Sequence, residues 1–268
     1  MAEERFEPPQ LPHVAMEVLK IAQDAEASLR QIGVVLAKNQ VLAARILKAA
    51  NSVLYSGPPV SNLTSAMMRI GLSGLKQLVC VYSFQCKVAR RHEYQHVLER
   101  YWIESVASAV AADGIARARH ADIQLPFLAA LVHDIGRPIA LTILADLRRD
   151  HLNFRKADEA AILKLVELVH GRLGGLVAAR WKLPRELQET MIYHHEAVIY
   201  KGAARELVLT IAGADAFVGR IGVGGQPEQQ FSADAYKVFR ELGLDRSHIE
   251  GIVRPVRERA EQLAGLMG

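Results

Sequence analysis

The stretch that decides the fold is Leu128–Leu141, LAALVHDIGRPIAL. It places a histidine and an aspartate side by side, His133 and Asp134, between an apolar run and a glycine. Neighbouring residues share no stripe on a helix, so these two side chains point in different directions. Burying two such polar groups among apolar residues is costly unless each has a partner. The pair therefore predicts a bound partner at this point of the fold.

Outward from this stretch, apolar residues recur at helical spacing along nearly the whole chain. Pro126 opens the helix expected to hold both His133 and Asp134, and Pro138 opens the next one. The sequence SLRQ (28–31) has the pattern of a capping box ahead of an apolar stripe. No convincing run alternates apolar and polar residues with period two. The sequence predicts an all-α protein, a multi-helix bundle.

The bulk properties favour a cytoplasmic protein. Half of the 268 residues are hydrophobic, which is enough for a sizeable core. The two cysteines, Cys80 and Cys86, fit neither a disulfide framework nor a zinc-knuckle spacing. The acidic, proline-bearing start MAEERFEPPQ is not a signal peptide. No apolar run is expected to reach the roughly 18–20 residues of a membrane span, so no membrane contact is predicted.

The charge is distributed unevenly, although the net charge is only +4. Between Ala27 and His92 there is no Asp or Glu, and the stretch carries nine basic residues: Arg30, Lys38, Arg45, Lys48, Arg69, Lys76, Lys87, Arg90 and Arg91. One interpretation is a surface for an anionic partner, nucleic acid included. The other is a solvated face, or one docked on the more acidic C-terminal half. The second is favoured and nucleic acid is not expected as a partner, because no base-reading motif accompanies the charge.

Metal-capable side chains gather in the remainder of the chain. Seven of them are flanked by apolar positions of predicted helices: Glu104, His133, Asp134, His170, His194, His195 and Asp215. Imidazole and carboxylate suit borderline and hard divalent metals, and helical bundles project such groups inward from several helices. Taken singly, each residue has a plainer interpretation, such as a core histidine or a buried cap. Paired ions about 3.5–4 Å apart, bridged by a carboxylate, would suit phosphoester hydrolysis.

The order of these seven residues resembles the HD superfamily of metal-dependent phosphohydrolases. The upstream stretch Ile46–Val79, ILKAANSVLYSGPPVSNLTSAMMRIGLSGLKQLV, resembles the signature of HDOD domains, the HD-related output domains of bacterial signalling proteins. LVHDIGR (131–137) and ARWKLP (179–184) fit the same family. The resemblance covers roughly Leu11 to Arg220. It divides the chain into an N-terminal helical part (1–95), an HD-like core with the metal site (96–221) and a helical extension (222–268).

The resemblance implies one or two divalent ions, without distinguishing Fe, Mn, Mg, Zn or Ni. The His133–Asp134 pair would ligate metal with Asp134 as the bridge, and His170, the tandem His194–His195 and Asp215 would complete the set. Glu104 falls where the superfamily has its first histidine, which is a departure from the pattern.

The catalytic candidates implied by the resemblance are Asp134 and Arg137. Arg137 replaces the lysine of the family's HDIGK. A guanidinium can still clamp a phosphate, so we expect a phosphate ligand, rather than a protein carboxylate, to hold its charge. The Gly-Tyr-Pro loop of cyclic-dinucleotide phosphodiesterases is missing after His195. That absence argues against cyclic dinucleotides as substrates.

Two functions stay open on the sequence. The first is a bacterial signalling protein that binds metal, recognises a phosphorylated small molecule or nucleotide, and hydrolyses it. The second is a catalytically silent regulatory module of the same fold that binds a protein partner. In the second case the acid-free stretch would be the contact surface.

Overall fold

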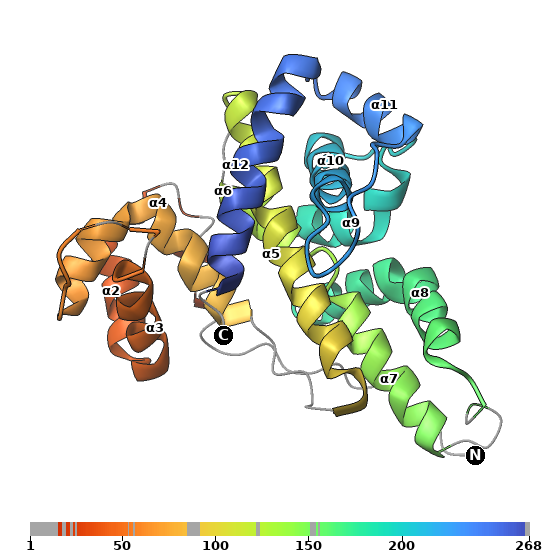
Figure 1. The fold of residues 1–268 in the computed structure, drawn as a ribbon, viewed down its shortest axis with the longest axis horizontal. Helices are drawn as coiled ribbons and strands as arrows, with labels where there is room; N and C mark the ends of the chain where they lie inside the picture. Colours follow the sequence, from red (N-terminus) through yellow and green to blue (C-terminus); the bar gives the residue numbers. More distant parts are fainter. Residues whose placement is uncertain are drawn as a thin grey trace.

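The structure, a computed structural model, describes most of the chain. The described residues are 16–17, 20–21, 24, 26–52, 54–55, 57–84, 92–121, 124–150, 154 and 156–265. Every regular element among them is a helix, so the predicted all-α fold is confirmed (Figure 1). The apolar stripe expected near residue 14 lies largely outside the described residues.

The N-terminal helices form a group at one side of the molecule (Figure 1). They are α2 (Leu29–Ala37), α3 (Gln40–Ala50) and α4 (Leu63–Phe84). The predicted capping box is present: the Gln31 amide donates to Ser28 Oγ at 3.4 Å, and the Ser28 amide donates to Gln31 Oε1 at 2.7 Å. Gly71 interrupts α4 with φ of +74°, a conformation that glycine adopts at little cost.

The remaining helices surround one long central helix (Figure 1). In chain order they are η1 (His92–Tyr94), α5 (Gln95–Ala118), α6 (Gln124–Val132), α7 (Gly136–Asp150), α8 (Glu159–Arg180), α9 (Arg185–Tyr193), η2 (His194–Glu196), α10 (Arg205–Ile221), α11 (Ala233–Glu241) and α12 (Arg246–Gly265). Helix α5 contacts α6, α10 and α12, while α7 packs along α8. The apolar faces of α5 are thereby covered on several sides.

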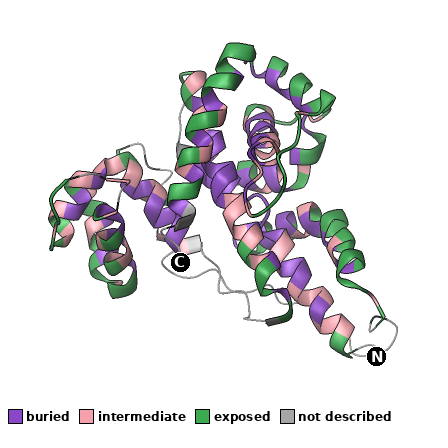
Figure 2. Ribbon diagram, in the orientation of Figure 1, coloured by how far each residue is buried: buried purple, intermediate pink, exposed green. Residues whose placement is uncertain are grey.

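The buried residues form a continuous core through these helices (Figure 2). It runs from Ile32 in α2 to Leu263 in α12, and α4 joins it through its contact with α6. A smaller cluster that includes Tyr94, Leu141 and Ile162 fills the space between α5, α7 and α8. The core includes residues on both sides of positions 95 and 221. The division of the chain at these positions stays a prediction.

One part of the core is apolar enough to resemble a membrane span. Leu125–Asp150, which spans most of α6, the following turn and α7, has the length and hydropathy of a membrane-crossing helix. The expectation that no apolar run is long enough to span a membrane is therefore wrong. In the structure 67% of its most apolar window is buried inside the protein. The apolar composition is therefore explained by packing of α6 and α7 in the core.

The acid-free stretch between Ala27 and His92 uses part of its positive charge internally. The Lys76 ammonium group is buried and donates to the carbonyl of Asp24 at 2.9 Å. The Arg69 guanidinium donates to the carbonyl of Ala50 at 3.1 Å. These two cations therefore bind backbone carbonyls within the N-terminal part itself, and neither contact is with the C-terminal half.

Helices α7 and α8 approach each other at two glycines. A Cβ atom built on Gly136 would lie only 2.0 Å from the carbonyl oxygen of His170. Gly174, one turn further along α8, would bring its own Cβ to 3.5 Å from the Gly136 nitrogen. The contact places the end of the His133–Asp134 turn directly against His170.

We predict that Gly136→Ala destabilises the protein by about 1–3 kcal/mol or more, because the added methyl group must push backbone atoms apart. It should also weaken metal retention, because His170 moves. Urea denaturation followed by circular dichroism measures the first effect. Gly251→Ala is the matched control in helix α12, where an added Cβ meets nothing within 4 Å. It should be neutral or stabilise by up to about 1 kcal/mol. Equal effects at the two positions would contradict the packing argument.

Candidate metal centre

The structure brings the predicted residues together from six elements. Glu104 lies in α5, His133 and Asp134 in the turn between α6 and α7, Arg137 in the first turn of α7, His170 in α8, His194 and His195 in η2, and Asp215 in α10. His133, Asp134, His170 and His194 are buried, whereas His195 is exposed at the edge of the group. The five residues His133, Asp134, His170, His194 and His195 are called the Asp134 cluster below.

Two local expectations were wrong. His133 and Asp134 do not lie within the helix opened by Pro126, because α6 ends at Val132 and a turn carries the pair. Pro138 lacks the amide hydrogen that the interior of a continuous helix would need, and it is tolerated in the first turn of a new helix, α7. The run VELVHGRLGG (166–175) predicts a helix end at His170, whereas His170 lies in the middle of α8.

Backbone carbonyls fix the orientation of three imidazoles. The Nδ1 of His133 lies 2.7 Å from a carbonyl three residues earlier, and that of His170 lies 2.9 Å from one three residues earlier. The Nδ1 of His194 lies 3.0 Å from a carbonyl four residues earlier. A neutral imidazole that donates from Nδ1 keeps its lone pair on Nε2. Each of the three rings therefore presents Nε2 as a ligand atom, held by the hydrogen bond behind it.

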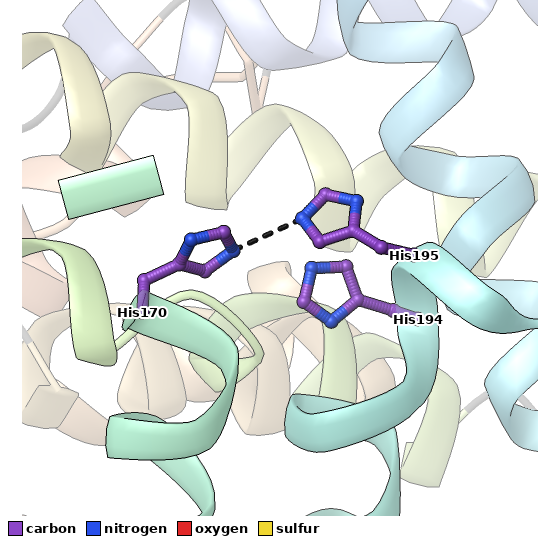
Figure 3. A group of neighbouring side chains, drawn as sticks. All are labelled: His170, His194 and His195. Atoms are coloured by element: carbon purple, nitrogen blue, oxygen red, sulfur yellow. Dashed lines mark hydrogen bonds between the residues drawn. The ribbon is translucent and has the colours of Figure 1, made fainter. Parts of the chain in front are cut away.

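The three Nε2 atoms converge on the carboxylate of Asp134. His170 Nε2 and His194 Nε2 lie 3.3 and 3.4 Å from its Oδ1. His133 Nε2 lies 3.2 Å from its Oδ2. On the open side of the group, the rings of His170, His194 and His195 face one another, with 3.0 Å between the Nε2 atoms of His170 and His195 (Figure 3).

The cluster leaves buried polar atoms without hydrogen bonds. Within the described part of the chain, His133 Nε2, His194 Nε2 and Asp134 Oδ1 have no hydrogen-bond partner. An unsatisfied buried polar atom costs about 1–3 kcal/mol, so three of them side by side call for an additional group. Two sets of ligand atoms lie within 4.8 Å of one another: His170, His194 and His195, and His133, Asp134 and His194. Nitrogen and carboxylate donors so arranged fit a divalent metal ion.

Asp215 faces the cluster from α10. Its Oδ1 lies 3.9 Å from His133 Nε2, and its side chain is about one-third exposed, at 32%.

Charges within the cluster shift the proton equilibria of the metal-free protein. Burial alone would lower the pKa of His133, but the negative charge of Asp134, 3.2 Å from its Nε2, outweighs burial and raises that pKa to about 10. Burial opposes ionisation of Asp134 as well, yet His133 and Arg137 together hold its pKa well below the usual range. The metal-free cluster is therefore an ion pair that carries a proton on an imidazole.

Arg137 corrects the expectation that no protein carboxylate would hold its charge. Its Nη1 lies 2.8 Å from Asp134 Oδ2 and 3.4 Å from Glu104 Oε2, and its Nη2 lies 3.0 Å from Glu167 Oε2. Its guanidinium carbon is 5.6 Å from the centre of the Tyr101 ring. The three carboxylates come from α5, α8 and the turn before α7, and only the fold brings them to one point.

Glu104 lies beside the cluster and faces arginines. Besides its contact with Arg137, its Oε1 lies 3.7 Å from Arg100 Nε. Burial raises the pKa of Glu104 to about 7, against the opposing effect of the two arginines. The sequence did not single out Glu167, whose carboxylate pairs with Arg137 and whose carbonyl holds the His170 ring. Its position one turn before His170 is the only signal that pointed to it.

The metal-free protein is predicted to lose stability as pH rises from about 6.5 to about 10. A raised folded-state pKa on His133 gives stability that is complete below its unfolded value and disappears through its folded value. Urea denaturation of chelator-treated protein at pH 7 and pH 9.5 measures the loss. Asp134→Asn is the control, since it removes the charge that raises the pKa, and its stability should depend less on pH. The same slope in both proteins would contradict the assignment.

Known proteins resemble this chain in sequence and in fold. A helical bundle with a buried His–Asp cluster defines the class of fold. Residues 9–197 match the family model of the HDOD domain, so the chain belongs to the HDOD family and the family resemblance is confirmed.

Relatives of the chain are distant in sequence. A protein of uncharacterised function from Treponema pallidum (strain Nichols) is 22% identical over 240 residues, which cover 87% of this chain. The chain spans about half the length of that curated relative, 46%.

Two crystal structures share the fold. One is a candidate metal-dependent phosphohydrolase from Shewanella amazonensis, with 23% identity, a TM-score of 0.69, and coverage of 97% of this chain and 92% of that one. The other is a candidate signal transduction protein from Marinobacter aquaeolei, with 20% identity, a TM-score of 0.69, and coverage of 97% and 59%. At such identities the likeness concerns the fold alone.

Proposed function

We propose that this chain is a bacterial signalling module that binds a divalent metal ion at the Asp134 cluster. It recognises a phosphorylated small molecule or nucleotide there and hydrolyses its phosphoester, in the cytoplasm. The single observation that carries the proposal is the convergence of three backbone-anchored imidazole Nε2 atoms on one buried carboxylate. The HDOD family membership and the phosphohydrolase name of a structural neighbour support it.

The residues of the cluster would have different roles in such a site. When bound, a divalent ion would polarise a phosphoryl oxygen and acidify a water molecule. Asp134, His170 and His194 would hold the ion, and the backbone hydrogen bonds of the two imidazoles would keep them from reorienting. His195, exposed at the edge, and Asp215, partly exposed, lie where a phosphorylated ligand would approach from solvent. Arg137 keeps a positive charge beside the ion, although carboxylates already hold it.

A second candidate is the catalytically silent interaction module. It is favoured by the outer face of α8, where Leu168 and Leu176 are 72% and 70% exposed. Two residues eight apart lie on the same side of a helix, so these leucines form part of one apolar stripe. Such a stripe suits a protein partner better than a small phosphorylated ligand.

Metal content is the first test of the proposed function. Protein purified without chelator should retain a divalent ion, and Asp134→Asn should lose it because a neutral amide replaces the central anionic ligand. Elemental analysis measures the ion. His248→Ala, which changes an exposed histidine of α12 paired with Asp245, is the control and should retain metal like the wild type. Equal metal content in Asp134→Asn and wild type would refute the site.

Hydrolysis is the second test. Metal-loaded wild type should release phosphate from at least one of a panel of phosphomonoesters, phosphodiesters and nucleoside monophosphates. Asp134→Asn should reduce the rate by at least about a hundredfold, the size expected when a positioned charge is removed. Metal binding without hydrolysis of any of these compounds would favour the silent module. In that case Leu168→Lys should impair partner binding while leaving metal content unchanged.

A further inference from the structure

The two oxygens of the Asp134 carboxylate face different surroundings. Oδ1 faces His170 and His194, at 3.3 and 3.4 Å, and has no hydrogen-bond partner in the described part of the chain. Oδ2 faces Arg137 Nη1, at 2.8 Å, and His133 Nε2, at 3.2 Å. One side of the carboxylate therefore lacks a cation, while the other side already has one.

The cation on the Oδ2 side is built into the fold. The Arg137 side chain is only 13% exposed, and it also contacts Glu104 and Glu167 at 3.4 and 3.0 Å. The Tyr101 ring lies 5.6 Å from its guanidinium carbon. A charge-assisted contact of this kind, repeated on three carboxylates, fixes the guanidinium firmly.

A metal ion on the Oδ2 side would compete with this arginine. It would draw on His133 and on Asp134 Oδ2, the oxygen that the guanidinium already contacts at 2.8 Å. It would also stand next to a buried like charge, which is unfavourable at short range. Arg100, 3.7 Å from Glu104, adds a second positive charge on that side.

The Oδ1 side has the opposite character. His170, His194 and His195 offer ligand atoms within 4.8 Å of one another (Figure 3). The contacts of Oδ1 in the described part of the chain are the imidazoles of His170 and His194, whereas the Arg137 contact is with Oδ2. The single Nε2 lone pair of His194 can bind one ion, because its Nδ1 faces backbone carbonyls at 3.0 and 3.1 Å.

We infer that the Asp134 cluster holds one divalent ion, on the Oδ1 side through His170, His194 and His195, and that Arg137 takes the place of a second ion on the Oδ2 side. The inference rests on the proposed metal site and specifies its occupancy. Arg137 is then a positioning residue that holds Asp134 and balances its charge.

His133 and His195 provide a matched pair for the test, because they are histidines on opposite sides of the same carboxylate. Metal-stripped protein is titrated with Mn²⁺, and bound Mn²⁺ is counted by elemental analysis after gel filtration. The wild type should bind one Mn²⁺ per chain. His195→Ala should raise its Kd at least about tenfold, in the range seen when metal-site residues are altered, and His133→Ala should change it less than about threefold.

The outcomes separate this inference from the proposed function. Two Mn²⁺ ions per wild-type chain would overturn the assignment of a single ion. A greater loss of Mn²⁺ affinity in His133→Ala than in His195→Ala would overturn its placement on the Oδ1 side. Neither result would overturn the proposed metal site. No Mn²⁺ bound by the wild type would overturn both.

The role of Arg137 has its own readout. Arg137→Met keeps the aliphatic stem and removes the charge, so it should admit a second, weaker Mn²⁺ and give the electron paramagnetic resonance signature of a coupled pair. Arg137→Lys keeps the charge and should stay at one ion. One ion in Arg137→Met at saturating Mn²⁺ would show that the arginine does not stand in for a second cation. The comparison of His133 with His195 stays decisive even where Arg137→Met does not fold.

Discussion

The buried carboxylate of Asp134 is the group on which the arrangement of the surrounding helices depends. A charge taken out of water must be compensated by well-placed partners. Those partners come from α7, α8 and η2, as well as from the turn that carries Asp134 itself. Helix α8 can reach the carboxylate only because Gly136 has no side chain where the carbonyl of His170 passes.

The same carboxylate needs a positive charge beside it when no metal ion is bound. Three imidazoles whose lone pairs all face one anion repel it unless a proton or a metal ion lies between them. Protonation of His133 relieves this repulsion. Asp134 raises the pKa of His133 to about 10, against the effect of burial, so His133 keeps this proton at neutral pH. A metal ion at the proposed site would compete with this proton for the same atoms, and its binding should release the proton.

The sequence predicted the parts of this structure that follow from local chemistry. The capping box at Ser28 follows from residue type and spacing. The break between the helices opened by Pro126 and Pro138 was predicted, but its position was wrong, because α6 ends at Val132 and leaves His133 and Asp134 in the turn. The pairing of Arg137 with Glu167 did not emerge, since an acidic residue on a helix surface is ordinary until tertiary packing brings an arginine to it.

The two departures of the sequence from the HD superfamily become one feature in the structure. By the family resemblance, Glu104 falls at a histidine position and Arg137 falls at a lysine position. Glu104 Oε2 and Arg137 Nη1 lie 3.4 Å apart, so the two replacements meet in a single ion pair. A neutral histidine at 104 could bind metal but could not balance a guanidinium, and a lysine at 137 could not reach three carboxylates with a planar fork. Arg137 also contacts Asp134 and Glu167, and Glu104 also lies near Arg100, so each charge has a further partner; together the two residues place a fixed positive charge beside Asp134.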